Sequence, residues 1–160
     1  MSSLARELPR ILEGHDAIAV GTRDAALRPS CSMAAGVAFS ADGSQVTVYV
    51  PEATGIQTLA DLADNGMIAV VFEDIPTHHT IQVKGRVIEM RPAAEDERAI
   101  VERWIGGFLA KVEAFGGPPS VVRKNRRWPC RADTFSVGVV FEQTPGPKAG
   151  TPFVAGGSAA

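Results

Sequence analysis

Strand-like segments joined by short turns are the feature that most limits what this chain can fold into. Apolar residues alternate with small or polar residues in several segments, and a period of two is typical of a half-buried strand. The turn residues Ser40-Ala41-Asp42-Gly43 favour a hairpin between two of these segments. The predicted strands are 17–23, 29–39, 45–50, 67–72, 77–90 and 134–143.

Helical patterns separate these strands into groups. Residues 3–14 have helical spacing, and Thr54-Gly55-Ile56-Gln57 matches a capping box at the start of a helix that ends at Asn65-Gly66. A longer helix carries Ile100, Trp104 and Phe108 four residues apart. A doubly wound sheet would need a helix at most crossovers. The order therefore predicts a mainly β, antiparallel barrel with flanking helices.

The strand over 29–39 has two unlike faces. Cys31 and Met33 lie on the face with large residues, which predicts that Cys31 is a small core residue, whereas Ser30 and Ser32 lie on the small face. Small residues allow either tight barrel packing or the close approach of a flat ring. Gly85, inside the strand over 77–90, predicts a bulge or a barrel corner.

Length and charge restrict the class of protein. The 160 residues suit one domain, which we place at 1–143, followed by a Gly- and Pro-rich tail at 144–160. The formal net charge of -2 argues against a nucleic-acid partner, and the lack of a long apolar run argues against a membrane span. The N-terminus does not resemble a signal peptide, and the chain has only two cysteines, so we expect a cytoplasmic protein.

Common catalytic motifs are missing from the sequence. It contains no P-loop, no G-x-G-x-x-G fingerprint and no G-x-S-x-G elbow. His78 and His79 are adjacent on a predicted strand, so their side chains would point to opposite faces. They would not chelate one metal ion, although a single histidine could ligate a haem. The basic cluster over 123–127, next to Trp128, is either a solvated helix face or a grip for a ligand phosphate.

The order of these segments resembles the pyridoxamine 5'-phosphate oxidase-like family. The matching pieces are Arg28-Pro29-Ser30, the strand ending at Val50, the loop 51–57, the strand over 67–72 and the stretch Thr80–Val87. The last piece is the most specific, because it is an alternating strand with a charged residue before Gly85 and a basic one after it. The resemblance covers roughly residues 5–143. It implies a six-stranded antiparallel split β-barrel, usually a homodimer with FMN at the subunit interface.

The resemblance also implies a set of cofactor-binding residues. Ser30 and Ser32 would line the flavin, the loop from Val50 to Gln57 would face its phosphate, and His79 and Thr80 would lie against the ring. Arg127 and Trp128 would complete the site from the partner subunit. The full set is Ser30, Ser32, Val50, Pro51, Thr54, Gln57, His79, Thr80, Arg127 and Trp128.

Two departures from the oxidase pattern affect the expected function. Met33 stands where the oxidase carries a lysine, and the segment over 54–57 carries no charge, which argues against pyridoxamine phosphate as the ligand. We expect a small FMN-dependent oxidoreductase that acts on an unidentified substrate. The alternative is a non-catalytic protein on the same fold that binds a flavin, a haem or another small ligand. Valine-rich strands and the small face over 29–39 independently favour a homodimer, because one subunit covers too little of this apolar surface.

Overall fold

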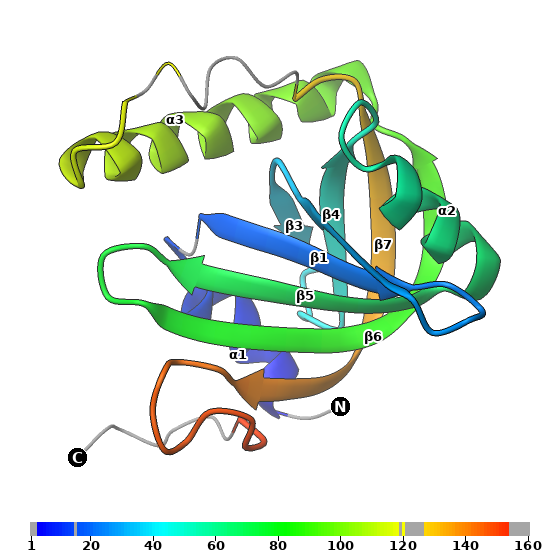
Figure 1. The fold of residues 1–160 in the computed structure, drawn as a ribbon, viewed down its shortest axis with the longest axis horizontal. Coiled ribbons are helices and arrows are strands. Elements are labelled where there is room, and N and C mark those ends of the chain that lie inside the picture. The colour runs from blue at the N-terminus through cyan, green and yellow to red at the C-terminus, as the bar shows by residue number, and fades with distance from the viewer. Residues whose placement is uncertain (1–2, 15, 119, 121–126, 154–160) are drawn as a thin grey trace.

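A computed structural model describes residues 3–14, 16–118, 120 and 127–153. In this structure a single antiparallel sheet curls around an apolar core, with helices at its ends and side (Figure 1). The helices are α1 (Ser3–Ile11), α2 (Ile56–Asn65) and α3 (Arg98–Ala114), with a short 3-10 turn η1 (Glu95–Glu97) before α3. The strands are β1 (Ala17–Arg23), β2 (Pro29–Met33), β3 (Val37–Phe39), β4 (Gln45–Pro51), β5 (Met67–Asp74), β6 (His79–Pro92) and β7 (Cys130–Glu142).

The sheet has seven strands in the order β2-β1-β5-β6-β7-β4-β3, and every described pairing is antiparallel. The prediction of six strands is wrong because the segment over 29–39 is not continuous. At Ala34 and Ala35 its backbone N–H groups turn to the carbonyls of Ile18 on β1 and Tyr49 on β4, at 2.9 and 2.7 Å. This link connects β2 and β3, which are the two edge strands of the sheet. The two strands do not pair with each other, so the barrel is open between them.

The two faces of β2 are reversed relative to the prediction. Ser32 lies opposite Val20, which is fully buried, and residues directly opposite in a sheet share a face. Ser32 is therefore the buried residue, at 8% exposure, while Cys31 is exposed and Met33 is 40% exposed. The prediction of Cys31 as a core residue is wrong because residue size alone does not identify the inner face.

A bulge shifts the alternation of β7. The pairing jumps from Lys84–Val139 to Gly85–Val137, so Gly138 has no partner on β6. Phe135 is buried before the bulge, whereas beyond it Val140 is buried and Val139 is 41% exposed. The residues that face inward therefore change by one position after Gly138, and the bulge predicted at Gly85 is confirmed.

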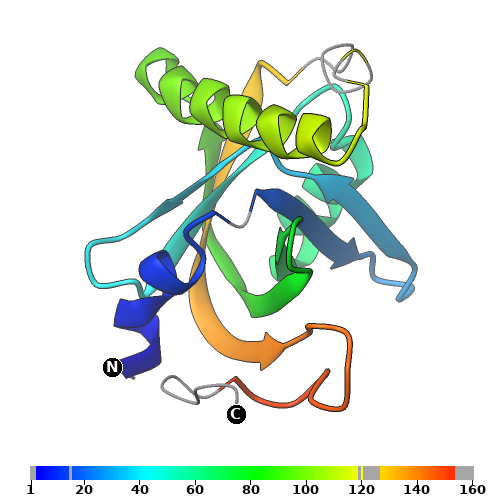
Figure 2. The ribbon, with the colours of Figure 1, turned by 90° about the vertical axis from the view of Figure 1, so that its left-hand side faces the viewer.

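The helices close the barrel from different sides. Figures 1 and 2 show α3 across one end of the sheet and α1 at the opposite end, while α2 lies at the side of the sheet. Leu8 of α1 and Leu62 of α2 are buried, and Val101 of α3 is 1% exposed. Each helix therefore contributes an apolar face to a core that includes the valine-rich inner face of β4.

Part of the predicted tail folds back onto the sheet. Phe153 donates its backbone N–H to Val140, and Gly150 donates its own to Glu142, so residues 144–153 run beside the end of β7. In the described part of the chain, no helix combines the length and the apolar character needed to cross a membrane.

Candidate functional site

A polar cluster lies where α2 covers the inner face of β1 and β2. Thr22 Oγ1 donates to Asp61 Oδ2 at 2.8 Å, and Gln57 Nε2 donates to Asp61 Oδ1 at 2.7 Å. The hydroxyl oxygens of Ser30 and Thr58 are 3.4 Å apart. The bonds to Thr22 and Gln57 compensate for the burial of the Asp61 carboxylate, which is 2% exposed.

Ser32 differs from this satisfied cluster. Its Oγ is buried on the same inner face and has no hydrogen-bond partner among the described residues. A buried hydroxyl without a partner is unfavourable, so an external acceptor or donor would stabilise it. Ser32 thus carries a buried hydroxyl whose hydrogen-bonding capacity the described residues leave unused.

The loop between β4 and α2 brings its backbone close to the barrel wall. A Cβ atom on Gly55 would lie 2.4 Å from Cγ1 of Val50 and 3.0 Å from the carbonyl oxygen of Pro51, so only glycine fits there. Gly55 is the N-cap of α2, and no side chain bonds the first turn. The predicted capping box is therefore wrong. Thr54 and Gln57 are exposed, and Gln57 instead donates to Asp61.

An uncapped helix N-terminus presents unpaired N–H groups and the positive end of the helix dipole. Here the first turn adjoins Ser30, whose hydroxyl lies 3.4 Å from that of Thr58, and Ser32 follows two residues later on β2. We call this region the polar junction, defined as Ser30, Ser32, the loop from Val50 to Gly55 and the first turn of α2. Its chemistry suits an anionic group beside a flat ring.

Arg127 and Trp128 lie next to the polar junction within the same chain. They precede β7, whose first residue Cys130 pairs with Pro51, and the N–H of Glu52 donates to the carbonyl of Pro129 at 3.0 Å. The sequence-predicted residues from β2, the β4–α2 loop and the start of β7 therefore gather at one end of the barrel. Arg123, Lys124 and Arg126 of the basic cluster lie outside the described residues.

His79 and Thr80 lie elsewhere. They begin β6, whose residues pair with the far end of β7, and His79 Nε2 lies 3.8 Å from Glu142 Oε2. Thr80 donates its backbone N–H to Thr144 Oγ1 at 3.0 Å. His78 is in the turn before β6 and not on the strand, with a left-handed φ of 56°. Within one chain the two groups of predicted residues are separated by the length of β6.

Two buried polar side chains were not predicted from the sequence. Trp104 of α3 is 7% exposed and its Nε1 lacks a described partner, while Asp133 of β7 is fully buried with both carboxylate oxygens unpaired. Burial raises the pKa of Asp133 to about 7, although the charge of Arg131 acts in the opposite direction. Trp104 belongs to an apolar helical row, so its spacing does not indicate that its N–H lacks a partner. The sequence around Asp133 likewise does not indicate that the carboxylate is buried without partners.

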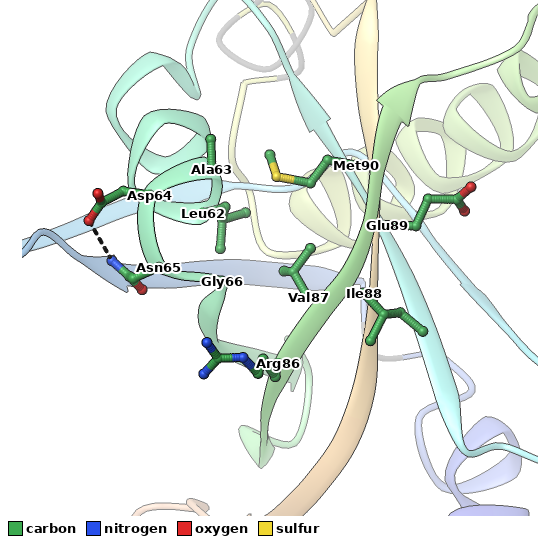
Figure 3. Close-up of a pocket in the computed structure, with 10 residues that line it drawn as sticks. All are labelled: Leu62, Ala63, Asp64, Asn65, Gly66, Arg86, Val87, Ile88, Glu89 and Met90. Atoms are coloured by element: carbon green, nitrogen blue, oxygen red, sulfur yellow. Dashed lines mark hydrogen bonds between the residues drawn. The ribbon is translucent and has the colours of Figure 1, made fainter.

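An open hollow of about 330 Å³ lies between the end of α2 and β6. Figure 3 shows Leu62 and Met90 facing it from the two elements, with Arg86 at its rim, while Glu89 points away. None of the sequence-predicted site residues lines this hollow. In the described residues, no group of three His, Cys, Asp or Glu side chains is arranged to hold a metal ion.

Comparisons with known proteins identify the fold. No family model and no curated protein matches the chain. Among solved structures, HupZ of Group A Streptococcus has a TM-score of 0.53 at 18% identity, covering 94% of this chain and 99% of HupZ. A proposed pyridoxamine 5'-phosphate oxidase from Lactobacillus delbrueckii has a TM-score of 0.52 at 13% identity, with 88% and 93% covered. An FMN-binding protein from Syntrophomonas wolfei has a TM-score of 0.52 at 11% identity, with 86% and 82% covered. The chain therefore has the split-barrel fold that its sequence resemblance predicts.

Proposed function

We propose that this split-barrel protein binds FMN at the polar junction and is a small FMN-dependent oxidoreductase. The observation that carries the proposal is the buried, unpartnered hydroxyl of Ser32 on β2, the strand whose Ser30 contacts the uncapped first turn of α2. Both features favour a ligand that combines a phosphate with a polar ring. The solved structures of this fold that are similar to the chain include an FMN-binding protein.

The residues of the polar junction fit different parts of FMN. The first-turn N–H groups of α2 would bind the phosphate, because they have no side-chain cap and lie at the positive end of the helix. Ser32 would hydrogen-bond a polar edge of the ring system. FMN, when bound, supplies hydride-transfer chemistry, and the protein contributes position and hydrogen-bond donors.

The first test is the absorbance spectrum of the purified protein, followed by mass spectrometry of the released ligand. We expect the flavin bands and the mass of FMN. FMN affinity is then compared in Ser32→Ala, which should weaken binding by about 2- to 10-fold through the loss of one neutral hydrogen bond. The matched control is Ser136→Ala, because the Ser136 hydroxyl contacts the carbonyl of Arg86 at 3.3 Å on the exposed sheet. Equal affinities of the two variants would contradict the assignment of Ser32.

A second candidate function is ligand binding without turnover. The one charged side chain of the loop between β4 and α2 is Glu52, which is exposed and repels a phosphate. This observation favours a non-catalytic protein that holds a flavin, a haem or another small ligand. The same spectrum distinguishes the candidates, since a Soret band would identify haem. Flavin bands in a protein whose flavin accepts no electrons from reduced nicotinamide cofactors would favour a carrier.

The outer face of the sheet favours a homodimer. Ala19 lies between Met33 of β2 and Val71 of β5, and Gly21 lies between Cys31 and Ala69. These six residues are small or apolar, and Figures 1 and 2 show no described helix over this part of the sheet. Covering it with a second copy would bury apolar area, as is typical of obligate dimers.

A dimer would also combine the two separated groups of predicted residues. Arg127 and His79 lie near opposite ends of the β6–β7 pair, on the order of 40 Å apart along the strands. If one flavin contacts both, they must come from different subunits. We expect Arg127→Ala and His79→Ala each to weaken FMN binding, with the loss of the charge-assisted contact of Arg127 costing about 10- to 100-fold.

The shared site is tested by mixing the Arg127→Ala and His79→Ala subunits. Each mixed dimer would carry one intact and one doubly altered site, so about half the sites of these dimers should bind FMN with wild-type affinity. Light scattering should show a dimer at micromolar concentration. A stable monomer, or a mixture in which no site regains affinity, would rule out the two-chain site.

A further inference from the structure

Two unpaired hydrogen-bond donors meet beneath α3. Trp104 is 7% exposed, and its Nε1 is buried without a partner among the described residues. The guanidinium of Arg127 lies over the Trp104 ring, with Cζ 5.4 Å from the ring centroid, and its Nε is likewise buried and unpartnered. Indole and guanidinium groups donate hydrogen bonds and accept none, so neither can satisfy the other.

The neighbouring side chains do not supply the missing acceptor. Phe108 stacks on Trp104 at 5.2 Å between ring centroids, which fixes the indole but offers no acceptor oxygen. The adjacent cation Arg98 is already paired with Glu95 and Glu102 at 3.1 and 3.2 Å. Arg127 makes no ion pair with any carboxylate in the described residues, and burial lowers its pKa.

The missing group is therefore an acceptor that carries negative charge. Arginine stays protonated at all accessible pH values, and Arg127 is partly buried with a buried Nε that has no described partner, so an adjacent anion would stabilise it. Two N–H donors and one positive charge suit an oxyanion, either a carboxylate or a phosphate. Arg127 also adjoins the polar junction, since its carbonyl accepts a 2.7 Å contact from Cys130 Sγ and Cys130 pairs with Pro51. This position next to an uncapped helix N-terminus favours a phosphate.

We propose that Trp104 Nε1 and Arg127 Nε together bind the phosphate monoester of the ligand. The proposal rests on the proposed function insofar as that ligand is FMN, and it adds Trp104 as a residue that distinguishes phosphorylated from unphosphorylated ligands. Free phosphate would share the same chemistry. The indole ring holds the guanidinium in place and supplies a second, uncharged donor to the same group.

The central test compares FMN with riboflavin, which lacks the phosphate. Trp104→Phe keeps an aromatic ring under Arg127 but removes the N–H donor. We expect it to lower the ratio of FMN to riboflavin affinity by about 5- to 10-fold, mostly through FMN. The matched control is Tyr49→Phe, which also removes an aromatic donor next to α3, but one that the chain satisfies through Glu97 at 2.9 Å. This control should leave the affinity ratio unchanged.

A second readout does not depend on flavin binding. The chain has two tryptophans, so its ¹H–¹⁵N spectrum has two indole N–H peaks, and Trp104→Phe identifies that of Trp104. Inorganic phosphate should shift this peak, and Arg127→Lys should reduce the shift. If Trp104→Phe does not fold, Arg127→Lys takes its place in the flavin titrations, with the same expected loss of preference for FMN.

The outcomes separate this inference from the proposed function. FMN binding with an unchanged affinity ratio in Trp104→Phe would overturn the inference and leave the function standing. Failure to bind FMN, together with a phosphate-dependent shift of the Trp104 indole, would overturn the function and support the inference for another phosphate ligand. Equal losses for FMN and riboflavin, or no shift with any phosphate, would overturn the inference.

Discussion

Replacing Gly85 with alanine is expected to destabilise the protein by at least about 3 kcal/mol. The added Cβ would lie 2.0 Å from the carbonyl oxygen of Ser136 and 2.7 Å from Cδ2 of Phe135. The oxygen belongs to the backbone of the neighbouring strand β7, so β6 and β7 would have to separate at the bulge. Phe135 is fully buried, so this movement would also disturb the core.

The measurement is urea or thermal unfolding, in which the melting temperature should fall by about 6 °C or more. Gly106→Ala is a matched control with the opposite expected sign. Gly106 lies inside α3 with nothing within 4 Å of its would-be Cβ, so alanine should stabilise the protein by about 0.5–1 kcal/mol. If Gly85→Ala is as stable as the wild-type protein, the close approach of the two strands is incorrect.

Replacing Asp133 with asparagine is expected to stabilise the protein at pH 8 by up to about 4 kcal/mol. The side chain is fully buried, neither carboxylate oxygen has a described partner, and burial raises the pKa of the carboxyl to about 7. An aspartate in the unfolded chain has a pKa near 3.9. The difference between these pKa values corresponds to about 4 kcal/mol.

The direction of this effect follows from proton binding. Between about pH 4 and pH 7 the folded protein holds a proton on Asp133 that the unfolded chain has released. The free energy of unfolding therefore falls as the pH rises through this range, and the loss is complete above about pH 7. Asparagine does not titrate, so the variant and the wild-type protein should differ little near pH 4 and most at pH 8.

Urea unfolding at a series of pH values checks this prediction. The quantity of interest is the difference in unfolding free energy between Asp133→Asn and the wild-type protein, because this difference isolates the contribution of residue 133. Asp64→Asn serves as the control, since Asp64 is exposed on α2 and its replacement should change the stability only slightly. A constant difference for Asp133→Asn would mean that its carboxylate is solvated.

Features that depend on neighbouring residues along the chain were predicted from the sequence. The alternating valines of β4 are buried, the turn over 40–43 joins β3 to β4, and Gly66 ends α2 in a left-handed conformation. Gly85 marks the bulge because a residue without a Cβ is needed wherever two backbones approach closely. Periodicity and glycine chemistry act locally, so the fold class and most elements could be predicted from the residues alone.

Features that depend on contacts between distant segments were not predictable in this way. Period-two alternation separates the two faces of a strand but does not identify which face is buried. In β2 the pairing of Ser32 with the buried Val20 places Ser32 on the inner face. The split into β2 and β3 depends on carbonyls offered by β1 and β4. The capping box at Thr54 fails because Gly55 packs against Val50, a contact that propensity does not describe.

The candidate site shows the same division. The resemblance placed Ser32 and Arg127 in one site by their positions along the chain, and pairing of β4 with β7 brings both to the same end of the barrel as α2. The sequence by itself determined the strands, the turns and which polar residues were available. Only the tertiary structure decided which of them lost their hydrogen-bond partners, as Ser32, Trp104 and Asp133 did, because desolvation depends on the packing of segments that are distant along the chain.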